Sequence, residues 1–500
     1  MSKVDSSEHP LGPLTLDGEK LQHVEDLTRR TYLADSRPWV IGYSGGKDST
    51  ALLQLIFYSL SELPSSQLTK PIYVISGDTL VEAPAIVDRI KTTHARIRER
   101  AAATGLPFVT EIVRPDLGNT FWVNMIGKGY PAPYQRFRWC TDRMKIQPAN
   151  LFIKSTVARF GEVVLALGVR RSESATRAQV MSLHKRHGES LSRHSELTGA
   201  WVYTPIEDWS TNDVWVYLLS CPSPWGDSNR DLVAMYKNAN AGECPLVVDT
   251  KTPSCGNSRF GCWVCTVVEH DRSMEAMVDN GEEWMEPMLQ FRDFLASTQD
   301  PAGKREIRDF RRRDGRVHLW ATKEEREEGK DKKRIIWGPY KFEFRKALLK
   351  RLLQTQIKVR QQGPEDVGPL ITMGELEEIR RLWRLEEGDW EDSVPRIWQD
   401  TIGTKYEWLH DDSAVGTVAE SSLLTEVASR YDLPTKLLTE LIDFERRTTG
   451  MHRRSRVNEH IDRILKKDWR SEDEVLRHTL AADEDSDVGA SVNVEDASAH

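Results

Sequence analysis

The sequence predicts an α/β fold with a doubly wound parallel sheet, followed by a mostly helical C-terminal region. Short apolar segments suited to buried strands alternate with segments of helical periodicity between residues 39 and 174. Several apolar segments run into glycine-rich or polar turns, as strands of a parallel sheet do before the next helix. Long charged amphipathic segments between about 280 and 470 indicate helices.

The elements of the first half follow in the order strand, helix, strand, which is the pattern of a parallel doubly wound sheet. A charged segment of helical spacing at 21–35 precedes the first strand, which begins at Trp39. The later elements are an amphipathic helix at 49–63, a strand at 71–78, a helix at 83–105 that ends at Gly105, a strand at 106–115 and a strand at 162–174 that runs into a polar turn.

The length of 500 residues allows two or three domains, and changes in composition suggest where they begin and end. Pro, Gly and Cys are dense in one region, and the end of the sequence is acidic and too poor in apolar residues to fold. We expect a flexible leader at 1–20, a sheet domain at 21–220, a cysteine-rich metal-binding insert at 221–280, a helical and locally basic domain at 281–480, and a disordered acidic tail at 481–500.

The net charge is -8, so any nucleic-acid surface has to be a local patch. No segment approaches the roughly 18 uncharged apolar residues of a membrane span, and the N-terminus has no signal-like apolar core. Six cysteines are too few for a disulfide scaffold. We therefore expect a cytoplasmic protein with no membrane partner, whose cysteines are free to bind metal or react.

The turn after the first strand, Ser-Gly-Gly-Lys-Asp-Ser, predicts a phosphate-binding loop. Its glycines let the backbone approach an anion, its hydroxyls and lysine add donors and positive charge, and its carboxylate suits a bridging Mg²⁺ ion. It is not a Walker A motif, because its glycines are one residue too close and Asp follows the lysine. The alternative is an ordinary glycine turn. The residues that we expect to bind ATP here are Ser44, Gly45, Gly46, Lys47, Asp48 and Ser49.

Two further turns are expected at the same edge of the sheet. Asp78 follows the second strand, and the alternative to a binding role is that it caps the next helix. Arg170, Arg171 and Arg177 surround a Ser-Glu-Ser turn, and clustered guanidinium groups bind phosphate bidentately. An exposed, salt-bridged loop is the alternative reading of the arginines.

Cys140 lies between four basic residues, Arg136, Arg138, Arg143 and Lys145. Positive neighbours lower the pKa of a thiol, and a thiolate can accept sulfur as a persulfide or attack an activated group. The sequence therefore predicts a catalytic or sulfur-carrying Cys140. The alternative is a buried structural cysteine.

Four more cysteines, Cys244, Cys255, Cys262 and Cys265, follow with the spacing C-x10-C-x6-C-x2-C. Four thiolates fit either a tetrahedral zinc ion or a [4Fe-4S] cluster, and spacing alone does not choose between them. The alternative is a redox dithiol formed by the last two. Cys221 has no partner at useful spacing and is expected in the core.

These segments together resemble a known family. The hexapeptide SGGKDS resembles the PP-loop of enzymes that split ATP between its α- and β-phosphates. The stretches GVRRSES and RWCTDRMKI resemble those of 3'-phosphoadenylylsulfate reductase relatives, where arginine and lysine face the substrate. With the late cysteine cluster, residues 30–345 look like the DndC family, the sulfurtransferase components of DNA phosphorothioate modification. A plain reductase carries a catalytic cysteine near its C-terminus, and this chain has none after Cys265.

The resemblance implies an adenine nucleotide alpha hydrolase-like fold and an ATP pyrophosphatase that adenylylates a DNA backbone phosphate and exchanges oxygen for sulfur. It implies ATP and Mg²⁺ as cofactors, a [4Fe-4S] cluster ahead of zinc, and catalytic roles for Cys140, Asp48 and Lys47. It places Asp78 near the nucleotide. The implied partners are DNA, a cysteine desulfurase and other Dnd proteins. The alternatives are a sulfonucleotide reductase, a tRNA-thiolating enzyme, or a metal-stapled DNA-binding subunit without activity.

A basic segment supplies a candidate DNA surface. Residues 301–360 contain 20 Lys and Arg against 9 Asp and Glu, with Trp320, Trp337 and Tyr340 interleaved for possible base stacking. A second basic helix is expected at 452–470. The alternative for both is a solvated helix face.

Overall fold

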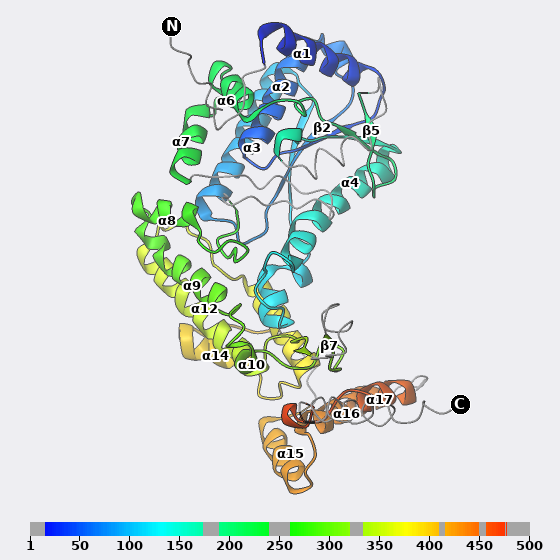
Figure 1. The fold of residues 1–500 in the computed structure, drawn as a ribbon, viewed down its shortest axis with the longest axis vertical. Coiled ribbons are helices and arrows are strands. Elements are labelled where there is room, and N and C mark those ends of the chain that lie inside the picture. Colours follow the sequence, from blue (N-terminus) through cyan, green and yellow to red (C-terminus); the bar gives the residue numbers. More distant parts are fainter. Residues whose placement is uncertain are drawn as a thin grey trace, which may run out of the picture. The chain divides into compact units, whose positions relative to one another are not determined.

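The computed structural model describes residues 16–173, 190–239, 261–320, 334–409, 416–449, 457–475 and 477 (Figure 1). These residues divide into two compact units. Unit 1 combines Met1–Phe121, Pro133–Leu295 and Lys358–Pro369, and unit 2 combines Trp122–Ala132, Ala296–Ile357 and Leu370–His500.

Unit 1 is built on a six-stranded sheet with the order β3-β2-β1-β4-β6-β5. All neighbouring strands are parallel except β5, which runs antiparallel to β6. The predicted parallel α/β fold is thus confirmed, while β5 and β6 were not predicted. The strands are β1 Trp39–Gly42, β2 Ile72–Gly77, β3 Phe108–Val113, β4 Val163–Ala166, β5 Ser192–Arg193 and β6 Ala200–Tyr203.

Helices pack on both faces of this sheet, because successive side chains of a strand point to opposite faces. Trp39 and Ile41 of β1 belong to one buried cluster, whereas Val40 belongs to the other. The first cluster includes residues of α1, α2, α3, α6 and α7, and the second includes Ile153 of α4. The helices are α1 Gly18–Leu33, α2 Lys47–Ser61, α3 Pro84–Thr104, α4 Gln147–Phe160, α6 Thr211–Ser220, α7 Asn229–Ala239, α8 Arg272–Asp279 and α9 Glu286–Ser297.

The order of the strands creates a switch point beside β1. The chain moves from β1 outward through β2 to β3, then returns to the other side of β1 as β4. At this point the connections from two adjacent strands run in opposite directions, which opens a crevice at the carboxyl ends of the strands. Ligands of such sheets bind in this crevice. In unit 1 the turns that follow β1 and β4 meet at this switch point.

Unit 2 is mostly helical, as the sequence predicted for this region. A two-stranded antiparallel ladder joins β7 Leu319–Trp320 to β8 Arg334–Ile335. Every helix among the described residues is too short or too polar to cross a lipid bilayer. The helices are α10 Lys304–Ile307, α12 Phe342–Gln362, α13 Met373–Leu382, α14 Ser393–Ile402, α15 Val418–Arg430, α16 Thr435–Thr448 and α17 Val457–Leu465.

Candidate phosphate loop and thiol pocket

The turn between β1 and α2 has the backbone of an anion-binding loop. Gly45 adopts φ +76°, a left-handed conformation that favours glycine. Gly46 occupies the N-cap of α2 and brings no side chain to cap the first turn of the helix. The amides at this N-terminus are therefore left to other acceptors, and an anion such as phosphate is a suitable one.

The two serines of the loop bind each other across the turn. The Oγ atoms of Ser44 and Ser49 are 3.1 Å apart, and the Ser44 amide donates to Ser49 Oγ at 3.2 Å. The Gly46 amide lies 3.4 Å from Ser44 Oγ. These contacts hold the loop in a defined shape.

Asp48 is the centre of a buried charge cluster. Its carboxylate accepts from Lys47 Nζ at 2.9 Å and forms a second ion pair with Arg170 Nε. Arg170 follows β4, so the turns of two adjacent strands meet here, as the sequence predicted. Arg170 also donates to Ser172 Oγ at 3.0 Å and to Thr211 Oγ1 at 3.1 Å.

Gly168 explains how the two turns come so close. A Cβ atom at this position would lie 2.8 Å from the carbonyl oxygen of Asp48. Only glycine therefore lets the turn after β4 lie against the start of α2.

The other two predicted nucleotide arginines have different outcomes. Arg171 forms ion pairs with Glu207 at 3.2 Å and with Asp208 at 3.3 Å, and its side chain is 40% exposed. For Arg171 the structure therefore matches the alternative to phosphate binding, which is an exposed, salt-bridged loop. Arg177 lies outside the described residues.

Asp78 does not cap α3, which starts at Pro84 with Ala83 at its N-cap. Its carboxylate instead accepts from the Leu80 amide at 3.0 Å and from Arg114 Nε at 2.9 Å. Leu80 has φ +64°, an uncommon value for a side chain of this kind. The turn after β2 is thus held in a specific shape and leads to a second site.

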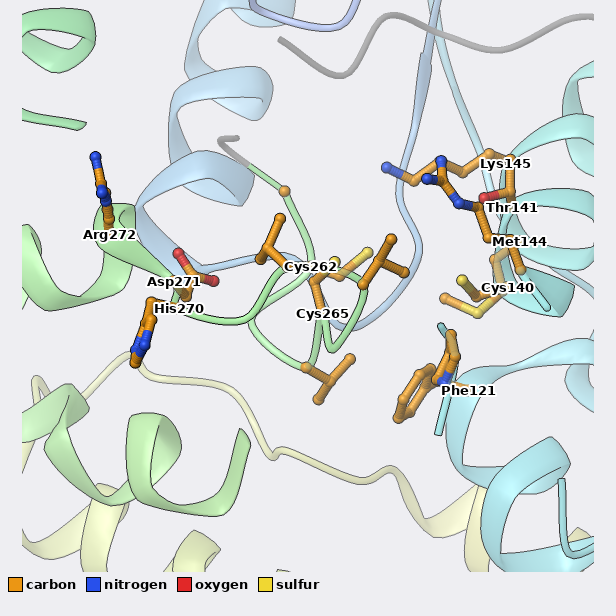
Figure 2. A pocket seen from close by; sticks show the side chains of 16 residues that line it. Phe121, Cys140, Thr141, Met144, Lys145, Cys262, Cys265, His270, Asp271 and Arg272 are labelled. Carbon is orange, nitrogen blue, oxygen red and sulfur yellow. The ribbon is translucent and has the colours of Figure 1, made fainter. Parts of the chain in front are cut away.

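This second site is a pocket lined by three cysteines. Cys140 lies on one side, at the start of the π-helical turn Thr141–Ile146, and Cys262 and Cys265 lie on the other (Figure 2). The Cys265 amide donates to the Cys262 carbonyl at 3.0 Å, which closes the C-x-x-C turn. The predicted ligands Cys244 and Cys255 lie outside the described residues. Sequence reasoning kept Cys140 apart from the cluster, because no spacing rule relates such distant positions.

The turn after β2 pairs directly with the cysteine turn. Glu82 and Cys262 form an antiparallel bridge, and the Trp263 amide donates to the Val81 carbonyl at 2.9 Å. Thr79 Oγ1 lies 3.3 Å from Cys262 Sγ. Lys145 Nζ approaches the Glu82 carboxylate at 3.9 Å. The cysteine turn that lines one side of the pocket is therefore held in place by the segment that follows β2.

The expected thiolate at Cys140 is corrected by the structure. Burial, together with the neighbouring Cys265, raises the pKa of Cys140 to about 12, although Lys145 opposes the shift. Burial and then Glu82 likewise raise the pKa of Cys262 well above its ordinary value. For both thiols the loss of hydration therefore outweighs the effect of the basic neighbours.

The chemistry of three thiols suits a soft metal centre. No group of three Cys, His, Asp or Glu side chains is placed to hold a metal ion within the described ranges. Cys262 and Cys265 are predicted metal ligands within the described ranges, and both line this pocket.

Two nitrogens of an arginine in the same pocket have no acceptor among the described residues. Nε and Nη1 of Arg138 are buried, and neither forms a hydrogen bond to any described residue. Arg138 lines the pocket beside Cys140 and Lys145. A buried guanidinium without an acceptor is costly, and an anionic ligand would remove that cost.

The basic segment of unit 2 is largely engaged within the unit. Arg313 pairs with Glu386 at 2.7 Å, Arg345 pairs with Glu387, and Arg308 Nε donates to the Gly338 carbonyl at 2.7 Å. Tyr340 is 1% exposed, so the expectation that it stacks on bases is wrong, because its ring belongs to the core.

Trp320, in contrast, is 47% exposed and accessible. Trp337 is half-buried. Residues 321–333, which hold part of the predicted charge, lie outside the described residues, as do residues 452–456 of the predicted second basic helix.

Comparisons with known proteins agree with this geometry. Residues 38–267 match the phosphoadenosine phosphosulfate reductase domain. An uncharacterized protein of Methanocaldococcus jannaschii is 24% identical over 241 residues, which cover 48% of this chain and only 38% of that protein.

Solved structures give only weak likenesses. The phosphoadenylyl-sulfate reductase of Candida auris is 17% identical, with 43% of this chain and 92% of that chain covered and a TM-score of 0.25. The U34-tRNA thiolase of Methanococcus maripaludis, solved with its [4Fe-4S] cluster, is 12% identical, with 47% and 82% covered and a TM-score of 0.26. At these scores the likenesses carry no argument about ligands. The match over residues 38–267 covers the strands β1 to β6 and the loop after β1, so this part of the chain is similar to a phosphoadenosine phosphosulfate reductase domain.

Proposed function

We propose that this protein is an ATP pyrophosphatase and sulfurtransferase of the DndC type, which replaces a non-bridging oxygen of a DNA backbone phosphate with sulfur. The observation that carries the proposal is the pairing of the segment 79–83, at the nucleotide edge, with the cysteine turn 261–263. Through this pairing, the sheet edge that carries the phosphate loop and the pocket of three thiols belong to one unit. A reaction that uses ATP to transfer sulfur needs a phosphate site and a thiol site.

The first step activates the DNA. The N-terminus of α2 and Lys47 bind the β- and γ-phosphates, and Asp48 would hold a Mg²⁺ ion that offsets the charge of these phosphates. An oxygen of the DNA phosphate attacks the α-phosphorus of ATP, the bond from this phosphorus to the bridging oxygen breaks, and pyrophosphate leaves. Arg170, released from Asp48, stabilises the charge that develops on the leaving group.

The second step exchanges oxygen for sulfur. The guanidinium of Arg138 binds the adenylylated phosphate, and the outer sulfur of a persulfide on Cys140 attacks the DNA phosphorus. The bond to the AMP oxygen breaks and AMP leaves. An external thiol then attacks the Cys140 sulfur, which frees the phosphorothioate and leaves a mixed disulfide on Cys140 that a second external thiol reduces.

The proposed iron–sulfur cluster would be held by Cys262 and Cys265, which line this pocket, together with Cys244 and Cys255, which lie outside the described residues. The sulfur itself comes from a cysteine desulfurase, and other Dnd proteins and DNA are the proposed partners.

The acceptor is tested by pyrophosphate release. Mg-ATP is given to the anaerobically purified full chain with duplex DNA, single-stranded DNA, tRNA or inorganic sulfate. We expect DNA of either form to stimulate release, with tRNA and sulfate inactive. Stimulation by tRNA alone would replace the proposal with a tRNA-thiolating enzyme, and no release with any acceptor would favour a binding subunit without activity.

The proposed sulfur transfer is tested by replacing single cysteines with serine. Cys140→Ser is expected to abolish phosphorothioate in DNA, measured by mass spectrometry of digested nucleotides, while DNA-stimulated pyrophosphate release continues. Cys221→Ser is the matched control, since Cys221 is half-buried against the core of unit 1 and does not line the pocket. Full modification by Cys140→Ser would exclude this residue from sulfur transfer.

A further inference from the structure

Tyr236 of α7 lies at the start of the phosphate loop helix. The amide of Lys47, the first residue of α2, donates to the Tyr236 hydroxyl at 3.3 Å. The Lys47 ammonium lies 5.7 Å from the centre of the Tyr236 ring. Tyr236 is 8% exposed. One buried side chain therefore contacts both the backbone and the charged group that we expect to bind phosphate.

The position of Tyr236 is fixed by the helices around it. Its ring packs edge-on against Trp215 of α6, with ring centres 5.1 Å apart. Asn229, at the start of α7, donates to the Leu218 carbonyl at 2.8 Å and so ties α7 to α6. The first residue of α6, Thr211, accepts from Arg170. The pair of helices α6 and α7 thus touches the charge cluster of Asp48 from two directions.

The hydroxyl occupies a place that suits an anion. Gly46 offers no side chain to the first turn of α2, so the Tyr236 oxygen supplies the acceptor for the Lys47 amide. A phosphate oxygen carries negative charge and is a stronger acceptor at a helix N-terminus than a phenol. A phosphate oxygen that binds this N–H must therefore displace the hydroxyl.

We propose that Tyr236 is a positioning residue that caps the phosphate loop while nucleotide is absent and yields the Lys47 amide to a phosphate oxygen when ATP binds. The inference rests on the proposed function, because it assumes that the loop binds a triphosphate.

The test compares binding of Mg²⁺ with α,β-methylene ATP, an analogue that cannot release pyrophosphate, by calorimetry on the full chain. Tyr236→Phe keeps the ring and removes the competing hydroxyl, so binding is expected to tighten about threefold to tenfold, the value of one hydrogen bond. Tyr217→Phe is the matched control with unchanged affinity. Its hydroxyl is also buried but has no hydrogen-bond partner among the described residues.

Equal or weaker binding by a folded Tyr236→Phe variant would overturn the inference while leaving the proposed function intact. If the wild-type chain binds no analogue, the proposed function fails first. A second measurement does not depend on that variant. Tryptophan emission is expected to change when the wild type binds the analogue, and this change should be lost in Trp215→Phe. Retention of the full change in Trp215→Phe would also overturn the inference.

Discussion

Arg170 and Asp48 form an ion pair whose side chains are only 2% and 4% exposed. The pair joins the turn after β4 to the first turn of α2, and Lys47 completes it. In this arrangement the carboxylate that suits Mg²⁺ is already occupied by two cations. Under the proposed function, metal and nucleotide would arrive together, because phosphate would replace the negative charge that Lys47 and Arg170 lose.

Asp48→Asn is therefore expected to affect both stability and activity. The substitution leaves two buried cations without their carboxylate, and breaking such a pair costs about 3–5 kcal/mol of unfolding free energy. Pyrophosphate release should fall roughly a hundredfold or more, since a ligand of the reacting phosphates is lost. Urea unfolding and a pyrophosphate assay measure the two effects. Asp88→Asn, at an exposed position of α3, is the control and should change neither.

Arg138→Leu is expected to separate function from stability. The substitution removes buried Nε and Nη1 atoms that have no acceptor in the described part of the chain, so stability should stay within about 1 kcal/mol of the wild type or rise. Transfer of sulfur to DNA should nevertheless be lost, because the anion in the pocket loses its partner. Thermal unfolding and mass spectrometry of DNA check the result. A large loss of stability would show that the guanidinium has a structural role instead.

His94 should make unit 1 sensitive to mild acid. Its Nε2 lies 2.8 Å from Ser76 Oγ, which itself donates to the Tyr43 carbonyl at 2.6 Å, so His94 must be the donor. Burial, aided by Arg98, lowers the pKa of His94 to about 4 from 6.5. As pH falls from 6.5 to 4, His94 is therefore protonated in the unfolded chain before it is protonated in the folded chain.

Through that interval the wild type is expected to lose about 3 kcal/mol of unfolding free energy from this group. Urea unfolding at a series of pH values measures the slope. His94→Gln retains a donor and should show a flatter profile. An identical slope in the variant would assign the acid sensitivity to other groups.

Glu387 gives a matching prediction for unit 2. Burial alone would raise the pKa of Glu387, but Arg345 and Lys436 lower it to about 2 from 4.5. A depressed carboxyl pKa stabilises the fold above 4.5, and this contribution is lost as pH falls toward 2. Glu387→Gln should cost about 3 kcal/mol at pH 7 and little near pH 2.

The neighbouring Glu386 is the control for this experiment. It pairs with Arg313, and the two side chains are 42% and 36% exposed. Exposed pairs are worth about 0–1 kcal/mol, so Glu386→Gln should have little effect at either pH. Equal losses in the two variants would contradict the role of burial.

The parts of the fold that depend on local pattern were predictable from the sequence. The strands β1 to β4, the end of α3 at Gly105 and the loop after β1 all follow from periodicity and glycine chemistry. The strand β5 was not predictable, because two residues carry no periodic signal. The antiparallel edge formed by β5 depends on its pairing with β6, which is a tertiary contact.

The thiol pocket could be predicted only in part. The C-x-x-C turn is a local signal, whereas the approach of Cys140 depends on how the chain folds between the two segments. The pKa of Cys140 likewise depends on tertiary structure that the sequence does not show. Its basic neighbours can be read from the sequence, but the burial that outweighs them cannot.

The bridge between Glu82 and Cys262 spans 180 positions of the chain, so during synthesis the sheet edge is complete long before the cysteine turn leaves the ribosome. Contacts this distant in sequence form late, because a long loop must close first. Until then the thiol of Cys140 is open to oxidants and to stray metals. Expression under oxygen should thus damage newly made chains more than finished ones.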